Sequence, residues 1–183
     1  MQTLSAVYSE GRIVVPAQNE ADSLYQDGYG TRTAPRTLTL EPCEALYLVE
    51  KDRLTVITEK DRRPTSFQQL LDNELERDVT LWIRYIVYRD IRGRGFVTKS
   101  SKDTSVSFVV YDRGSYLRKQ PSYEVYTVYE GMPETIGHLE DLLRKVGESE
   151  RSLKLAVVDR RGEIIYYGLD RLHFEELGPD VTE

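Results

Sequence analysis

The chain has 183 residues, enough for one large domain or two small ones with a real hydrophobic core. Its single cysteine, Cys43, excludes an intramolecular disulfide, and no signal-peptide pattern or apolar run of membrane-spanning length is present, so we expect a soluble, cytoplasmic protein that contacts no membrane. The net charge of −6 argues against a general nucleic-acid binder.

The first eighty residues predict short strands and short helices. SAVYSE, Gly11 and RIVVP together indicate a hairpin. Apolar periodicity and turn residues indicate the later elements. These are, in chain order, a helix at Ala21–Tyr25 ended by Gly28-Tyr29-Gly30, a strand around Leu38 and Leu40, a helix at Glu41–Val49, a strand at Leu54–Ile57, and a helix at Phe67–Leu75 with Ser66 as its N-cap.

The segment RDVTLWIRYIVYRDIRGRGF predicts a buried helix, apolar almost all round, with Asp78 as its N-cap and Gly93 as its stop. The elements after it are strands at Phe96–Lys99, Val106–Tyr111 and Tyr123–Tyr129, a helix at Thr135–Val146, strands LKLAVVD and IIYYGL around the turn at 160–163, and an extended segment RLHFEEL. Strands and helices mix without regular βαβ alternation, which indicates an α+β fold. A boundary near residues 76–80 predicts a small mixed domain at 1–77 and a second domain, with a central mixed sheet, at 78–183.

The charge is unevenly distributed along the chain. The segment from Arg84 to Lys119 holds nine Lys/Arg and three Asp/Glu residues, a net charge of +6, and the segment from Gln120 to Glu150 is acidic. This pattern indicates either a phosphate-binding surface beside a partner surface or ordinary solvated faces. We expect no metal site, because His138 and His173 lie far apart and no Cys/His spacing suits zinc.

Tyr111 ends a predicted strand at a basic, glycine-containing loop. RNA cleavage without a metal needs a base, an acid and a cation that stabilises the phosphorane. Arg113, Arg118 and Lys119 have the right sign to help a tyrosine lose its proton; otherwise Tyr111 is a half-exposed strand residue. His138 is a candidate acid, but its place at the start of an amphipathic helix favours a surface or capping residue.

Four motifs, in order, resemble those of the archaeal tRNA-splicing endonucleases. TLTLEPCEALYLVE resembles a leucine-rich strand that runs into a helix of the N-terminal domain, and IRYIVYRDIRGRGFVTKS resembles the family's RY-x-VY-RDLR-x-RGY-x-VK signature. FVVYDRG resembles the strand that ends in the catalytic tyrosine loop, and LKLAVVDRRGEIIYY resembles the last hairpin. The resemblance covers nearly the whole chain and implies an N-terminal domain of this type followed by a nuclease-like domain.

The resemblance also implies a catalytic tyrosine, a histidine about ten residues later and a lysine before AVVD. Tyr111 matches the tyrosine, but Gln120 or Pro121 stands at the histidine and Arg151 or Ser152 at the lysine. Lys154 lies too close to AVVD to replace that lysine. We therefore expect no catalytic residue here, and predict the structural subunit of a heterotetrameric enzyme whose partner subunit performs the chemistry.

The same resemblance implies precursor tRNA with a bulge–helix–bulge as the substrate, cleavage to a 2′,3′-cyclic phosphate by the partner subunit, and no cofactor. The residues expected at RNA are Arg92, Arg94, Lys99, Lys102, Arg113, Arg118 and Lys119, and those expected at the subunit interface are Asp159, Arg160, Arg161, Glu163, Ile164 and Tyr166. Two alternatives stay open: an active subunit that uses Tyr111 with a non-standard acid, and a non-enzymatic RNA-binding scaffold.

Overall fold

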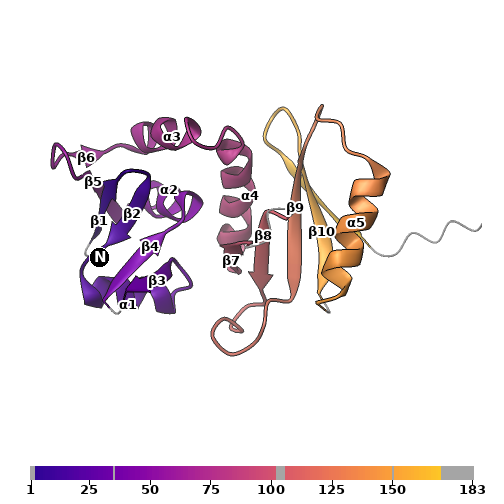
Figure 1. The fold of residues 1–183 in the computed structure, drawn as a ribbon, viewed down its shortest axis with the longest axis horizontal. Helices are drawn as coiled ribbons and strands as arrows, with labels where there is room; N and C mark the ends of the chain where they lie inside the picture. Colours follow the sequence, from indigo (N-terminus) through magenta and orange to yellow (C-terminus); the bar gives the residue numbers. More distant parts are fainter. Residues whose placement is uncertain (1–2, 35, 102–105, 150, 170–183) are drawn as a thin grey trace, which may run out of the picture.

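The computed structural model describes residues 3–34, 36–101, 106–149 and 151–169. Two β-sheets lie at either side of one long helix, α4 (Leu81–Gly93), and a further helix, α5 (Ile136–Gly147), covers the outer face of the second sheet (Figure 1). Helices and mixed sheets combine in an α+β fold, which confirms the predicted class.

The first sheet has the strand order β3-β4-β2-β1-β5-β6. The predicted hairpin is present, and Glu10 and Gly11 form its turn with positive φ angles of 49° and 77°. Strands β1 and β5 pair in parallel, with α2 as the helix before β5. The elements are β1 (Leu4–Ser9), β2 (Arg12–Val15), α1 (Gln18–Gln26), β3 (Thr31–Ala34), β4 (Thr37–Leu40), α2 (Pro42–Glu50), β5 (Leu54–Thr58), β6 (Pro64–Thr65) and α3 (Phe67–Leu75).

The second sheet has the order β11-β10-β9-β8-β7. Its strands are β7 (Val97–Ser100), β8 (Phe108–Tyr111), β9 (Tyr123–Tyr129), β10 (Ser152–Val158) and β11 (Ile164–Leu169). Strands β9 and β10 are parallel and α5 connects them, whereas the other neighbours are antiparallel. Among the residues that the structure describes, strand β11 is therefore an edge strand of this sheet.

One hydrophobic core runs from the first sheet through α2 and α4 to the second sheet. Leu46 of α2, Tyr85 and Tyr88 of α4, and Phe108 of β8 are all fully buried members of it. A smaller cluster, which includes Leu142, lies beneath α5. Complete burial of such side chains contributes roughly 1.5–3 kcal/mol each, so α4 holds the two sheets together.

Both ends of α4 differ from the prediction. Thr80, not Asp78, is the N-cap; Asp78 lies two residues further out and accepts hydrogen bonds from the Thr80 N–H and hydroxyl. Gly93 is still helical, and the left-handed position belongs to Gly95, with φ 85°. The Gly95 and Phe96 N–H groups donate to the carbonyls of Arg92 and Ile91, as in a Schellman motif.

Two strands, β3 and β6, were not predicted. Strand β3 reads TRTA and its residues are all exposed, so it lacks an alternating apolar pattern, and β6 has only two residues. The predicted extended segment RLHFEEL lies outside the described residues. The predicted boundary near residues 76–80 falls in the connection between α3 and α4 and stays a prediction. Within the described ranges, no helix has the length and apolar character to cross a bilayer.

Replacing Asp78 by alanine should lower the free energy of unfolding by about 1 kcal/mol at pH 7. Partial burial opposes ionisation, but hydrogen bonds from Thr80 and the charge of Arg84 outweigh it and lower the pKa of Asp78. A lowered folded-state pKa gives stability that is present above the unfolded-state value and lost as pH falls through the folded-state value. Urea unfolding at several pH values should therefore show the wild-type advantage vanish in acid; an advantage independent of pH would contradict this assignment.

Candidate functional site

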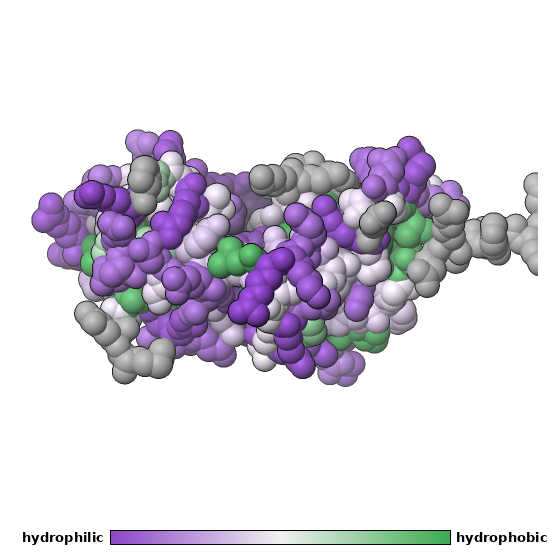
Figure 2. Space-filling model, turned by 90° about the horizontal axis from the view of Figure 1, so that it is seen from below, coloured by the Kyte–Doolittle hydropathy of each residue, from purple (hydrophilic) through white to green (hydrophobic). Residues whose placement is uncertain are grey.

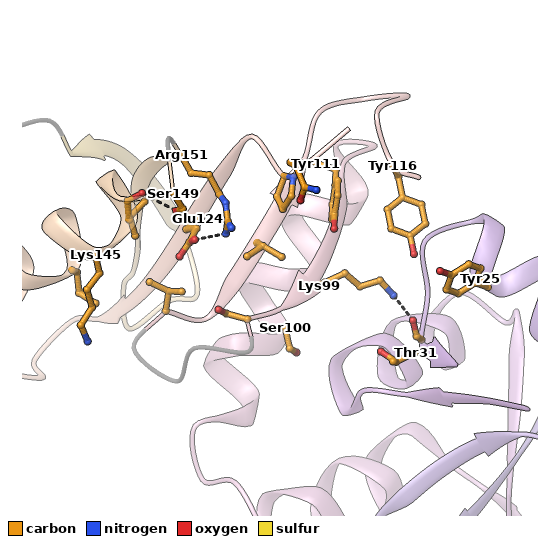
Figure 3. A pocket seen from close by; sticks show the side chains of 18 of the residues that line it. Tyr25, Thr31, Lys99, Ser100, Tyr111, Tyr116, Glu124, Lys145, Ser149 and Arg151 are labelled. Atoms are coloured by element: carbon orange, nitrogen blue, oxygen red, sulfur yellow. Dashed lines mark hydrogen bonds and ion pairs between the residues drawn. The ribbon is translucent and has the colours of Figure 1, made fainter. Parts of the chain in front are cut away.

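A cavity of about 810 Å³ opens beside the second sheet. Strands β7, β8 and β9 and the C-terminal half of α5 line it, and the segment around β3 contributes the wall from the first sheet (Figure 3). Of the described residues, three tyrosines, four cations and one carboxylate line it; these are Tyr25, Tyr111, Tyr116, Arg32, Lys99, Lys145, Arg151 and Glu124.

The topology brings three separate parts of the chain to this cavity. Glu124 pairs across the sheet with Val109 of β8 and with Leu153 of β10. Because side chains alternate along a strand, Tyr111 and Arg151, each two residues from those partners, face the same side of the sheet as Glu124. Gln120 and Pro121 line the cavity from the loop before β9. All the positions that the resemblance singles out, except Ser152, thus border this cavity.

Tyr111 ends β8 and stacks edge-to-face with Tyr116, with ring centroids 5.2 Å apart. Tyr116 in turn reaches Tyr25 of α1, at 6.4 Å. Burial, followed by the neighbouring tyrosines, raises the pKa of Tyr116 to about 12. The three rings connect the two halves of the molecule across the mouth of the cavity (Figure 3).

Arg151, at the place of the family's lysine, is already paired. Its guanidinium donates a hydrogen bond to the Glu124 carboxylate, and these side chains are only 27% and 10% exposed. A cation held by a nearly buried carboxylate has less charge to offer a phosphate. Ser152 is exposed and does not line the cavity.

His138 belongs to a different cluster. Its Nδ1 lies 2.6 Å from Oε1 of Glu134, whose other oxygen accepts a hydrogen bond from Tyr126. Thr135 caps α5 by accepting from the His138 N–H. The cavity touches α5 only from Leu142 onward, so His138 does not reach Tyr111. The second histidine, His173, lies outside the described residues.

The cations expected at RNA separate into buried, tethered and exposed groups. Lys99 donates to the Gly30 carbonyl and to Glu44, and Arg92 donates to the Asp27 carbonyl and stacks on Tyr29, so both connect internal parts of the molecule.

Arg113 donates twice to the Arg94 carbonyl, and Arg94 pairs with Asp90. Arg118 and Lys119 are exposed, and no side-chain hydrogen bond or ion pair within the described ranges engages them. Lys102 lies outside those ranges. Of the predicted set, the structure therefore leaves Arg118 and Lys119 as the cations most available to a ligand.

The residues expected at the subunit interface fall into two groups, one in the turn between β10 and β11 and one on β11. In the turn between β10 and β11, Asp159 accepts hydrogen bonds from the N–H groups of Arg161 and Glu163, and backbone hydrogen bonding from Glu163 leads the causes that lower its pKa. Arg161 also pairs with the carboxylates of Asp159 and Glu163. The Arg160 N–H donates to the carboxylate of Glu130.

On β11 itself, Tyr166 points inward and donates to Asp90, and Ile164 packs against the core. The alternate residues, Ile165 and Tyr167, are 58% and 52% exposed and were not predicted. The alternation of side chains along the strand IIYYGL is the pattern that could have predicted this apolar outer face.

Glu44, Glu124 and Tyr116 are the site residues that sequence reasoning missed. The two glutamates lie far along the chain from their partners, Glu44 from Lys99 and Glu124 from Arg151. The sequence weakly indicates Tyr116 as a site residue, because it is the one aromatic residue in the basic loop.

Two family models match the sequence. The model of the tRNA intron endonuclease N-terminal domain matches residues 4–71, and that of the tRNA intron endonuclease catalytic C-terminal domain matches residues 81–166. Curated proteins called tRNA-splicing endonuclease are similar over nearly the whole chain. That of Methanococcus vannielii is 30% identical over 171 residues, 93% of this chain and 96% of the relative, and that of Pyrococcus furiosus is 27% identical over 176 residues, 95% and 100%. That of Thermococcus kodakarensis is 26% identical over 166 residues, 91% and 96%.

Proposed function

Because this chain belongs to the tRNA-splicing endonuclease family, we propose that it is the non-catalytic structural subunit of a heterotetrameric enzyme. The enzyme removes introns from precursor tRNA, and a partner subunit that keeps tyrosine, histidine and lysine performs the cleavage. We place this work in the cytoplasm. The two matched segments support a division into an N-terminal domain, residues 1–77, and a nuclease-like domain, residues 78–183.

One observation carries the proposal: the cavity keeps a tyrosine but holds neither a free acid nor a free cation at the family positions. Gln120 and Pro121 stand where the acid is needed, and neither has a side chain that transfers a proton near neutral pH. Arg151 stands where the cation is needed, and Glu124 neutralises it. Tyr111 alone supplies one of the three roles that metal-independent cleavage requires.

The outer edge of the second sheet supports the assembly. Within the described part of the chain, strand β11 has no partner strand on its outer edge, and Ile165 and Tyr167 add exposed apolar surface to it. Such an edge favours pairing with a strand from another chain. The turn at 159–163 projects beside it, so both features suit contact with partner subunits.

Replacing Tyr111 by phenylalanine should leave the cleavage rate of the assembled enzyme within about twofold of wild type, because a tyrosine without acid and cation cannot complete the proton transfers. The measurement is single-turnover cleavage of an intron-containing precursor tRNA by the reconstituted heterotetramer. The same substitution in the tyrosine of the catalytic subunit is the matched control and should abolish cleavage.

A loss of about a thousandfold for Tyr111→Phe with assembly intact would instead identify an active subunit that uses a non-standard acid. Among the described residues, Glu124 is the carboxyl group that lines the cavity, and Glu124→Gln would then lose activity as well.

A further inference from the structure

A cluster of aromatic rings and cations lies where the second sheet extends beyond the C-terminal end of α4. Nζ of Lys154 lies 4.2 Å from the centre of the Tyr123 ring, and the Arg113 guanidinium lies 4.9 Å from the centre of the Phe96 ring. The two rings meet edge to face, with centroids 6.4 Å apart. Figure 2, which views the molecule from this end, shows a mainly hydrophilic face with small separate hydrophobic areas. This cationic cluster, Phe96, Arg113, Tyr123 and Lys154, therefore suits a charged ligand better than an apolar one.

The two cations of the cluster keep their charge. Arg113 donates to the carbonyl of Arg94, which is a neutral acceptor, and in the described part of the chain no carboxylate pairs with Lys154. Burial and then the charge of Asp112 raise the pKa of Tyr123, so Asp112 lies nearby, but its carboxylate accepts a hydrogen bond from a serine hydroxyl. An aromatic ring attracts a cation without neutralising it. The cluster thus presents two positive charges to an anionic partner.

Strand β11 brings the end of the described chain to this cluster. Lys154 of β10 pairs in register with Gly168, and β11 ends at the next residue, Leu169. A Cβ placed on Gly168 would have no atom of the described residues within 4 Å, so the sheet surface beside Lys154 is open. The chain that follows Leu169 therefore starts beside Lys154, on the neighbouring strand.

The sequence that follows Leu169 has the opposite charge. It reads DRLHFEELGPDVTE, residues 170–183, and holds five Asp/Glu residues and one arginine, a net charge of −4 with histidine neutral. Neighbouring strands lie about 4.8 Å apart, so the path from β11 across β10 and β9 to the loop after β8 is about 14 Å. An extended residue spans about 3.3 Å, and four or five residues therefore cover this path. Glu175 and Glu176 lie at this distance along the sequence from the end of β11.

We propose that the C-terminal segment, residues 170–183, binds back across the cationic cluster of its own chain, with Glu175 and Glu176 at Lys154 and Arg113. A tethered segment meets such a surface at an effective concentration in roughly the millimolar range, so weak charge pairs are enough to hold it and a freely diffusing anion is at a disadvantage. While the segment is bound, this face of the sheet is closed to other anions. The inference is independent of the proposed function, because it concerns contacts within one chain.

The test is paramagnetic relaxation enhancement in the full-length, isotope-labelled chain with a nitroxide attached to Gly178→Cys. Burial raises the pKa of the Cys43 thiol to about 12, so the nitroxide reagent selects the engineered cysteine. The amide signals of Phe96, Tyr123 and Lys154 should broaden at low salt and recover at high salt, because salt screens exposed charge pairs.

Charge variants of the same labelled chain identify the contact. Glu175→Gln/Glu176→Gln should lower the ratio of bound to free segment about tenfold, because two exposed charge pairs are lost. Lys154→Gln should lower the ratio in the same direction by a smaller factor. Glu140→Gln/Glu148→Gln is the matched control: it makes the same change in net charge at two exposed positions on and beside α5, and should leave the ratio unchanged.

Absence of broadening in the labelled chain would overturn the inference, as would equal broadening in Glu175→Gln/Glu176→Gln. A mixture of isotope-labelled chain without nitroxide and nitroxide-labelled chain without isotope should show no broadening. Broadening of equal size in that mixture would make a second copy the occupant and would overturn the intramolecular contact. If the nitroxide has no effect and a single-stranded oligouridylate shifts the same amide signals, the cluster binds nucleic acid and the proposal fails.

Discussion

Replacing Lys99 by methionine should lower the free energy of unfolding by about 3–5 kcal/mol, because it removes one partner of a buried ion pair. The Glu44 side chain is 1% exposed and Lys99 17% exposed, and Nζ of Lys99 lies 2.9 Å from the carboxylate. The other Glu44 oxygen accepts hydrogen bonds from the N–H groups of Gly30 and Glu41, at 2.9 Å each. Without Lys99, the carboxylate keeps its burial and loses its countercharge.

This ion pair connects the two halves of the molecule. Lys99 lies on β7 of the second sheet, whereas Glu44 lies on α2, and Nζ also donates to the Gly30 carbonyl beside β3 at 2.7 Å. Burial lowers the pKa of Lys99, and the attraction of Glu44 opposes that shift. Removing the Lys99–Glu44 ion pair should therefore weaken the contact between the two sheets and also lower the free energy of unfolding.

Urea unfolding followed by circular dichroism is the measurement. Lys119→Met is the matched control, since the same change at an exposed loop position should alter the free energy of unfolding by less than about 0.5 kcal/mol. Equal unfolding midpoints for the two variants would show that Lys99 is not needed for stability, and would return it to the set of candidate RNA contacts.

Reversing the charge of Glu163 should weaken tetramer assembly by several kcal/mol while changing the stability of the isolated chain by no more than about 0.5 kcal/mol. The side chain is 68% exposed and its ion pair with Arg161 lies at the surface, where such pairs contribute little. In the proposed assembly the turn lies against a partner subunit, so Glu163→Lys reverses the charge of a side chain that becomes desolvated at that contact.

Analytical ultracentrifugation of the mixed subunits measures this effect, with Glu140→Lys, an exposed charge reversal on α5, as the control. We expect the dissociation constant to rise roughly 100-fold or more for Glu163→Lys. Unchanged assembly at low salt would remove the turn from the interface and would leave Arg160 and Arg161 to be tested as contacts to RNA phosphate.

Local signals predicted most of the secondary structure. Ser66 followed by Gln69 forms a capping box, and α3 begins and ends where the periodicity predicts. Turn residues and alternation likewise predicted the first hairpin and β11. The end of α4 was misplaced because both Gly93 and Gly95 fit a helix stop, and only the backbone geometry distinguishes them. Strand β3 forms because β4 pairs with it, which its own polar sequence does not reveal.

The site was predictable only where a motif names a position. Tyr111, Gln120 and Arg151 line one cavity, and the sequence pattern identified each of them. Glu124 was unpredictable in the role of countercharge, because its pairing with Arg151 depends on the parallel neighbours β9 and β10. Lys99 and Arg92 were assigned to RNA from charge alone, and charge does not report burial.

The most direct test of the central claim is cleavage of an intron-containing precursor tRNA under single-turnover conditions by the purified chain alone, by the catalytic subunit alone and by the mixture. The cavity motivates this test. It keeps Tyr111 but has Gln120 and Pro121 at the position of the acid, and Glu124 neutralises Arg151. We predict no cleavage by this chain alone and efficient cleavage by the mixture, with products that end in a 2′,3′-cyclic phosphate. Robust turnover by a preparation of this chain free of any partner would contradict the account.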